Sequence, residues 1–366
     1  MASMTSRERW RAALRMQPVD RLPFWPKIFD KSYMQAQPSP YREMTIAELY
    51  GFIKCDPHVP LPACLREVRT KTSVESVTTN GVQKTTYTAL SGILEAVDHF
   101  DVASGSWHPV IFPVKVREDI GVMVEIFEDC QMELDAEKLE ANRKTIAWLG
   151  ENGSTWTGIG RSPLMNWLEF VAGIEGGQYL LADYPEEVER LFDAMHRVLV
   201  RSAGVLTEHS PVDALYMIED TSTTYISPTQ YDRYCKPQIS AYGDIVRSAG
   251  RPMMLHMCGH LMGLLPMLST MPADGFEAFT SPPVGNTTLL DGRAACPDKT
   301  LVGGTNATLW LQPADSIIAQ IEADLDALPH HRGVVISSAG MMPPACHPET
   351  IKQVCQWVQR YPARMA

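Results

Sequence analysis

Hydrophobic and polar positions along this chain change their period several times, and each change predicts an element. Apolar positions recur at helical spacing over residues 6–16, and a short strand is expected near residues 22–25. Residues 70–88 alternate β-branched and polar side chains around Asn80-Gly81, a pair that suits the positive φ angles of a type I′ turn. The pattern therefore predicts a lead-in helix followed by an early antiparallel hairpin.

After the hairpin, the pattern becomes an alternation of helices and strands. Helical spacing covers residues 115–127 and 135–149. Strand candidates follow at residues 155–159, 214–218, 252–257, 275–278, 300–302 and 334–337. Strands that alternate with helices imply right-handed crossovers and a parallel sheet. We therefore expect one α/β domain over residues 1–366, a single (β/α)8 TIM-type barrel with an N-terminal helical lead-in and a β-hairpin insertion at about 70–88.

Composition and charge narrow the classes of function. The chain has 366 residues, of which 45% are hydrophobic and 20% charged, as in ordinary globular proteins. A formal net charge of -11 argues against binding to nucleic acid, which needs a basic face. No apolar run approaches the roughly 18 residues that cross a bilayer, and the polar residues 1–9 lack the apolar stretch of a signal peptide. We expect a soluble cytoplasmic protein with no nucleic-acid or membrane partner.

Two further observations concern the class of chemistry. The 8 cysteines are scattered without the dense pairing of a secreted scaffold, which favours reduced thiols or metal ligands over disulfides. The glycine-rich motifs of dinucleotide and nucleoside-triphosphate sites and the G-x-S-x-G motif of serine hydrolases are absent from the sequence. The usual readings of an α/β protein as a dehydrogenase, an NTPase or a serine hydrolase are therefore removed.

Residues 253–260, MMLHMCGH, carry the most informative chemistry. An apolar run ends in His256 and Cys258, which share one face of a strand because side chains repeat every second residue. A histidine nitrogen beside a thiolate sulfur makes half of a zinc site. An inert buried cysteine next to a hydrogen-bonded histidine would give the same pattern, so this segment alone predicts either a metal site or ordinary packing.

The predicted barrel would bring other polar residues to the same place. The carboxyl ends of barrel strands converge on one mouth, so residues at those ends become neighbours. A carboxylate-rich strand end, the His-x-Cys pair and a loop with another cysteine can together supply the three protein ligands of an open catalytic zinc site. The strand-end residues are Glu219, Asp220, His256, Cys258, Glu277, Thr305, Asn306 and the loop from Ser337 to Cys346.

Several of these motifs resemble the uroporphyrinogen decarboxylase superfamily. The similar segments are TSRERWRAAL at 5–14, PVDRLP at 18–23, Ile226-Ser227-Pro228 with Tyr231 and Pro237, and His256-Met257-Cys258-Gly259. The resemblance runs nearly end to end. It implies an α/β barrel that acts either as a porphyrinogen decarboxylase or as a zinc-dependent methyltransferase working with a corrinoid protein.

Residues 25–32, WPKIFDKS, separate these two branches. Porphyrinogen decarboxylases carry an arginine-rich segment here that pairs with the carboxylates of their substrate, and this chain has no arginine in the stretch. Without arginine side chains to form bidentate pairs, the negative charges of such a substrate would be poorly neutralised. The resemblance therefore favours the methyltransferase branch, with a decarboxylase-type lyase as the alternative.

Within that branch, the resemblance implies zinc but leaves the ligand set open. Thiol-methylating members use His-x-Cys and a later cysteine in a Gly-Cys-Gly turn, whereas residues 337–344 here contain none and Cys346 follows shortly after. Other members are similar to one another in having two carboxylates and a histidine as ligands. The corresponding positions here are Asp220, Cys235 and His256, so a cysteine replaces the middle carboxylate. Three sets compete: His256, Cys258 and Cys346; His256, Cys258 and Cys235; or Asp220, Cys235 and His256. Only His256 is common to all three.

The function that the resemblance implies is a methyl transfer assisted by zinc. We expect a methyl group to move from a methylated small molecule, an aromatic methyl ether above others, to the cobalt of a corrinoid (cobalamin) on a partner protein, because zinc can hold the departing anion. The alternatives are a methylcobalamin:thiol methyltransferase, the lyase, and a barrel that binds ligands without catalysis. The resemblance also implies a homodimer.

Roles within this reaction are assigned to the following residues. His256, Asp220 and Glu219 are the predicted catalytic residues. Arg161 is expected to pair with a substrate carboxylate, or else with a carboxylate of the barrel. The predicted walls for a flat apolar ring, which equally suit core packing, are Trp25, Trp107, Trp156, Tyr216 and Met257.

Overall fold

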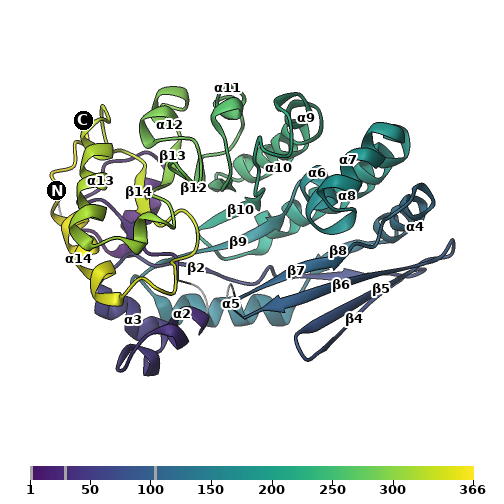
Figure 1. Ribbon diagram of the computed structural model, residues 1–366, viewed down its shortest axis with the longest axis horizontal. Coiled ribbons are helices and arrows are strands. Elements are labelled where there is room, and N and C mark those ends of the chain that lie inside the picture. The colour runs from purple at the N-terminus through teal and green to yellow at the C-terminus, as the bar shows by residue number, and fades with distance from the viewer. Residues whose placement is uncertain (1–2, 29–30, 103–104) are drawn as a thin grey trace.

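The core of the protein is a parallel sheet of eight strands that is nearly closed into a barrel. The computed structural model describes residues 3–28, 31–102 and 105–366. Ladder pairing follows the order β1-β14-β13-β12-β11-β10-β9-β2 (Figure 1). The strands are β1 (Phe24–Trp25), β2 (His58–Pro60), β9 (Ser154–Gly160), β10 (Ala214–Ile218), β11 (Met253–His256), β12 (Gly275–Phe279), β13 (Thr300–Gly304) and β14 (Val334–Ser337). The predicted single TIM-type barrel is confirmed.

Asp56 ties the seam between β1 and β2, the two strands at the ends of the pairing order. Its backbone amide donates to the carbonyl of Phe24 at 2.8 Å, and the amide of Phe24 donates to its carboxylate at 3.1 Å. The same carboxylate, fully buried, accepts hydrogen bonds from Arg9 and Arg21, each at 2.6 Å. One backbone hydrogen bond and the side-chain bonds of Asp56 therefore hold together β1 and β2, which are not paired with each other in the strand ladder.

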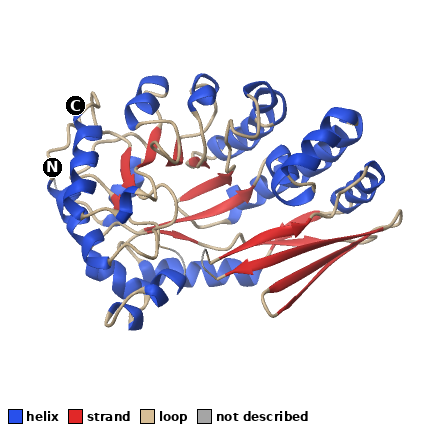
Figure 2. Cartoon of the chain, in the orientation of Figure 1, coloured by secondary structure: helices blue, strands red, loops and turns tan. Residues whose placement is uncertain are grey.

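Most helices lie around the outside of the barrel sheet, as Figure 2 shows in blue around the red strands, whereas α1 packs Trp10 into the barrel interior. The helices are α1 (Ser6–Ala13), α2 (Lys31–Ala36), α3 (Ile46–Ile53), α4 (Arg117–Glu128), α5 (Ala136–Leu149), α6 (Pro163–Asn166), α7 (Ile174–Asp183), α8 (Pro185–His209), α9 (Pro228–Tyr234), α10 (Lys236–Ser248), α11 (Leu265–Leu268), α12 (Leu289–Ala295), α13 (Ala314–Asp326) and α14 (Pro348–Arg360). A capping box between Thr5 and Glu8 begins the predicted lead-in helix α1. Within the described ranges, no helix has the length and apolar character to span a bilayer.

A second sheet is inserted between β2 and β9. The predicted hairpin is present, with Asn80 and Gly81 at positive φ, but it is half of a four-stranded antiparallel sheet. The pairing of the third and fourth strands contains a bulge: Val97 pairs with Ile111 and Asp98 with Pro109, so Val110 on the fourth strand is the extra residue. In Figure 1 this sheet extends away from the barrel. The inserted strands are β4 (Ser73–Thr79), β5 (Val82–Thr88), β6 (Ile93–Asp101) and β7 (Ser106–Ile111), while β3 (Leu65–Val68) pairs with β8 (Gln131–Leu134).

The barrel interior is filled by aromatic side chains around His58. The imidazole of His58 stacks on Trp10 with ring centroids 4.1 Å apart, and its nitrogens lie 2.6 Å from Ser154 Oγ and 3.0 Å from Tyr216 Oη. Burial lowers the pKa of His58 to about 3. This neutral, fully bonded histidine is part of the packed core of the barrel and lies apart from the site described below.

Candidate metal centre

Asp220, His256 and Cys258 form a cluster with one ligand atom each, and these atoms lie within 4.8 Å of one another. The register of β10 and β11 pairs Ile218 with His256, so the residues that follow both strands meet at the same edge of the sheet. Oδ1 of Asp220 lies 2.9 Å from Nε2 of His256 and accepts a hydrogen bond from the Cys258 thiol at 3.4 Å. In the part of the chain that the structure describes, this is the one group of this kind.

Two backbone features hold this cluster together. Asp220 has a φ of 39°, a left-handed conformation that aspartate tolerates better than most residues. Gly259, the residue after Cys258, lies very close to the loop that follows β10. A Cβ at this position would lie 2.3 Å from Cβ of Ser222 and 2.4 Å from the carbonyl oxygen of Thr221. The loops after β10 and β11 are therefore pressed together by local chain geometry that only glycine permits at this position.

The donor set is of a kind that zinc can bind. Carboxylate oxygen, imidazole nitrogen and thiolate sulfur bind zinc at about 2.0–2.3 Å, so donors within this spread can share one ion after small side-chain movements. Three protein ligands leave a fourth position for a substrate or water. The side chains of His256 and Asp220 are 15% and 29% exposed, so solvent or a small ligand can reach the cluster.

Electrostatics within the cluster also suit a cation. Burial alone would raise the pKa of Asp220, but the hydrogen bond and charge of His256 and the charge of Arg161 lower it well below the ordinary value. Burial would lower the pKa of His256, but the charge of Glu277 and the bond to Asp220 raise it well above the ordinary value. His256 lies between the carboxylates of Asp220 and Glu277, and these negative surroundings suit a cation.

A buried carboxylate and a buried lysine stand behind His256. Glu277 on β12 is the register partner of His256 and accepts a hydrogen bond from its Nδ1. Lys27, in the loop after β1, donates to the other oxygen of Glu277 at 2.7 Å. Burial would raise the pKa of Glu277, but the charges of Lys27 and His256 lower it to about 2. Glu277 was expected at a strand end from the sequence, but neither Glu277 nor Lys27 carried a predicted role.

The predicted residues Glu219 and Arg161 lie beside the cluster. Both oxygens of Glu219 are held by Ser162, through its amide at 2.7 Å and its hydroxyl at 2.6 Å, and burial raises the pKa of Glu219 to about 7. Arg161 lies 3.3 Å from Asp220 and 2.8 Å from Glu169, so its guanidinium pairs with barrel carboxylates. Arg161 thus contacts the cluster through Asp220, whereas the carboxylate of Glu219, next to Asp220 in the chain, is bonded to Ser162.

Cys235 and Cys346 lie outside the cluster. Cys235 is fully buried at the start of α10, where it accepts a hydrogen bond from Ser162 at 3.5 Å and burial raises its pKa well above the ordinary value. Cys346 is also buried, and burial raises its pKa to about 12. The set that the structure brings together, Asp220 with His256 and Cys258, combines ligands that the sequence offered in competing sets.

The predicted aromatic walls are mostly core residues. Trp25, Tyr216 and Met257 are fully buried, and the Trp156 ring packs against Tyr216 at a centroid distance of 4.5 Å. Trp107 is on β7 of the inserted sheet. Of the arginine-free stretch at 25–32, Phe29 and Asp30 lie outside the described residues.

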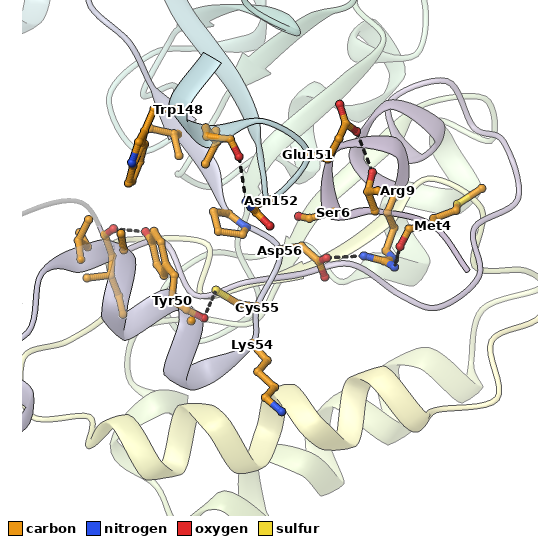
Figure 3. Close-up of a pocket in the computed structure, with 18 of the residues that line it drawn as sticks. Met4, Ser6, Arg9, Tyr50, Lys54, Cys55, Asp56, Trp148, Glu151 and Asn152 are labelled. Carbon is orange, nitrogen blue, oxygen red and sulfur yellow. Dashed lines mark hydrogen bonds and ion pairs between the residues drawn. The ribbon is translucent and has the colours of Figure 1, made fainter. Parts of the chain in front are cut away.

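A separate cavity of about 860 Å³ lies beside the β1–β2 seam, between α1, α3 and the end of α5 (Figure 3). Its charged lining includes Arg9 and Asp56, which Figure 3 shows bonded to each other. None of the three clustered residues lines it. The cavity is therefore distinct from the candidate metal centre.

Comparison with known proteins identifies the family. The family model described as uroporphyrinogen decarboxylase (URO-D) matches residues 135–361, more than half of the chain. This chain belongs to the uroporphyrinogen decarboxylase (URO-D) family. The resemblance found in the sequence is confirmed at the level of this family. The search of curated proteins gave no match.

Solved structures agree with the URO-D fold over the whole chain. A methyltransferase from Methanosarcina mazei has a TM-score of 0.62 and 15% identity, and the match covers 99% of this chain and 100% of that protein. A B12-independent methionine synthase from Shewanella sp. W3-18-1 has a TM-score of 0.51 and 12% identity, with 92% and 97% covered. At these identities, the likeness shows a shared fold.

Proposed function

We propose that this URO-D family protein is a zinc-dependent methyltransferase whose metal ligands are Asp220, His256 and Cys258. The observation that carries the proposal is the convergence of these three side chains, partly exposed, at the carboxyl ends of β10 and β11. In barrels of this type, active sites lie at that face. The M. mazei structure, described as a methyltransferase, supports the reaction class.

The proposed reaction takes a methyl group from a methylated small molecule, with an aromatic methyl ether favoured, and passes it to the cobalt of a corrinoid on a partner protein. The bond between methyl and its oxygen, nitrogen or sulfur breaks, and that atom keeps the electron pair, while cobalt(I) of the partner's reduced corrinoid supplies the pair for the new cobalt–methyl bond. When bound, zinc supplies a Lewis acid for the departing atom. The partial exposure of Asp220 and His256 leaves that atom an approach to the cluster.

The chain's own groups supply position and charge. Asp220 contributes negative charge and a hard oxygen donor, and Cys258 contributes the one sulfur of the cluster. A single sulfur among the ligands is less soft than the two-sulfur set of a thiol-methylating site, which favours an oxygen or nitrogen leaving group over a thiolate. Arg161 forms an ion pair, at 3.3 Å, with the other oxygen of the Asp220 carboxylate, Oδ2.

The structure offers a further argument against a decarboxylase of polyanionic porphyrinogens. Within residues 25–32, the structure describes the side-chain contacts of one basic residue, Lys27. Its ammonium donates hydrogen bonds to Glu277 and to the carbonyl of Ala339. It is also buried, with 5% exposure. This cation is therefore committed to the protein and is not free to pair with substrate carboxylates.

The test combines metal binding with turnover. The purified protein, stripped with chelator, is titrated with zinc, and its methyl transfer is assayed with a reconstituted corrinoid protein and methoxylated aromatics. We expect one zinc per chain and transfer that is lost on stripping and restored by zinc. Absence of zinc uptake would refute the proposal, and so would decarboxylation of a porphyrinogen that is indifferent to zinc.

A further inference from the structure

Behind the proposed metal ligand His256 lies a chain of buried contacts that crosses the barrel mouth. Nδ1 of His256 faces Glu277, and the second oxygen of Glu277 accepts from Lys27 at 2.7 Å. Glu277 and Lys27 are 2% and 5% exposed, so their orientation is determined by contacts within the protein. A metal-binding histidine is commonly oriented by a partner on its other ring nitrogen.

Lys27 is fixed in its turn by a second set of contacts. Its ammonium also donates to the carbonyl of Ala339 at 2.9 Å, and its own carbonyl accepts from the amide of Met342 at 3.3 Å. Ser338 bonds to the carbonyl of Pro26 at 3.1 Å. The loops after β1 and β14 are therefore fastened together, and the lysine extends from this junction to β12.

The backbone around these residues is also specialised. Lys27 has a φ of 53°, Ala278 next to Glu277 has 63°, and Ala339 has 61°. Non-glycine residues rarely adopt the left-handed region, and they persist there only where surrounding contacts fix them. Three such residues along one chain of contacts show that the fold maintains this arrangement against local preference.

We propose that Lys27 is a positioning residue that acts through Glu277 on His256 and thereby sets the affinity of the metal centre. This inference rests on the proposed function. Lys27 holds the Glu277 carboxylate in one orientation, the carboxylate holds Nδ1 of His256, and Nε2 is left directed at Asp220, 2.9 Å away. A free Glu277 would let the imidazole turn out of the line that joins it to the other two ligands.

The test measures zinc affinity rather than turnover. Chelator-stripped wild type, Lys27→Gln, Glu277→Gln and the double variant are titrated with zinc against a chromophoric chelator. Lys27→Gln keeps a donor for Ala339 and removes the ammonium. We expect Lys27→Gln to weaken zinc binding about 10- to 100-fold, the usual effect of removing such an orienting contact. Lys27→Met serves as a second variant if Lys27→Gln does not fold.

The double variant separates positioning from general damage. If Lys27 acts through Glu277, adding Lys27→Gln to Glu277→Gln should change the affinity by less than about threefold, because the route is already broken. The cobalt-substituted forms should show the same order in the intensity of their tetrahedral absorption bands. Equal losses in both backgrounds would overturn the inference, as would wild-type affinity and spectrum in Lys27→Gln.

Lys299 provides the matched control. It is a buried lysine at the start of β13, 8% exposed, whose ammonium donates to the carbonyl of Met271 at 3.1 Å. Lys299→Gln should leave zinc affinity unchanged. If wild type itself binds no zinc, the proposed function fails; if wild type binds zinc and Lys27→Gln binds it equally, this inference alone fails.

Discussion

Oδ1 of Asp220 lies 2.9 Å from Nε2 of His256, although Asp220 lies two residues beyond the end of β10 and His256 is the last residue of β11. The contact depends on the parallel register of β10 and β11 and on the left-handed backbone of Asp220. It converts two residues that are ordinary in sequence into adjacent donors. Cys258, two residues after the end of β11, completes the cluster.

The first prediction concerns which residues hold the metal. Asp220→Ala and Cys258→Ala should each lose tight zinc binding, because each removes one of three clustered donors. Cys235→Ser and Cys346→Ser should keep one zinc per chain, because both thiols are buried outside the cluster. Zinc content after gel filtration and titration of the stripped protein measure the difference. Loss of zinc in Cys346→Ser with retention in Asp220→Ala would instead support the sulfur-rich ligand set of His256, Cys258 and Cys346.

The second prediction concerns the glycine after Cys258. A Cβ at Gly259 would meet the carbonyl oxygen of Thr221 at 2.4 Å, so Gly259→Ala should push apart the two loops that carry the ligands. We expect zinc affinity to fall at least tenfold. Gly263→Ala is the control, because its nearest contacts are at 3.6 Å, an ordinary van der Waals distance. Similar zinc affinities for the two variants would show that the loop contact does not position the ligands.

The third prediction concerns the stability of the barrel seam. Asp56→Ala removes the acceptor of Arg9 and Arg21 and leaves the buried guanidinium of Arg9 with fewer partners. Breaking a buried pair in this way costs about 3–5 kcal/mol in the free energy of unfolding. Glu151→Ala, which breaks a 3.9 Å surface pair with Arg7, should change stability by less than about 1 kcal/mol. Urea denaturation measures both, and equal values would contradict the assigned role of Asp56.

The fourth prediction concerns pH. Burial lowers the pKa of His58 to about 3 from an ordinary value of 6.5, so between these values the unfolded chain binds a proton that the folded chain does not. Stability from this group is therefore complete above pH 6.5 and falls as the pH drops towards 3, by about 1.4 kcal/mol per unit. His58→Gln should remove this part of the slope between pH 4 and 6. Parallel slopes for variant and wild type would show that His58 is protonated in the folded protein.

The barrel was largely predictable from the sequence because its later strands are short apolar runs separated by helical spacing. The bounds of β10 and β14 match residues 214–218 and 334–337. The strand β2 was missed, since a three-residue strand that ends in Pro60 is too short to show a period. The inserted sheet was only half predicted, and its fourth strand carries both Pro109 and the bulged Val110, which weaken the strand pattern in the sequence.

The site was less predictable than the fold. His256 and Cys258 stand out in the sequence, and Asp220 was named at a strand end. Their grouping depends on strand adjacency and on one unusual φ angle, neither of which the sequence shows. The contact between Lys27 and Glu277 joins positions 250 residues apart. The single charged residue in the apolar strand Gly275–Phe279 was a usable signal for Glu277, whereas nothing local marked Lys27.

The eight cysteines differ sharply in accessibility. Seven are buried, and Cys258 alone is partly exposed. An alkylating reagent or an oxidant applied to the folded protein would thus meet first the sulfur proposed to hold the metal. Chemical modification of this protein is therefore expected to begin at the proposed metal centre, and a bound ion would protect the thiol there.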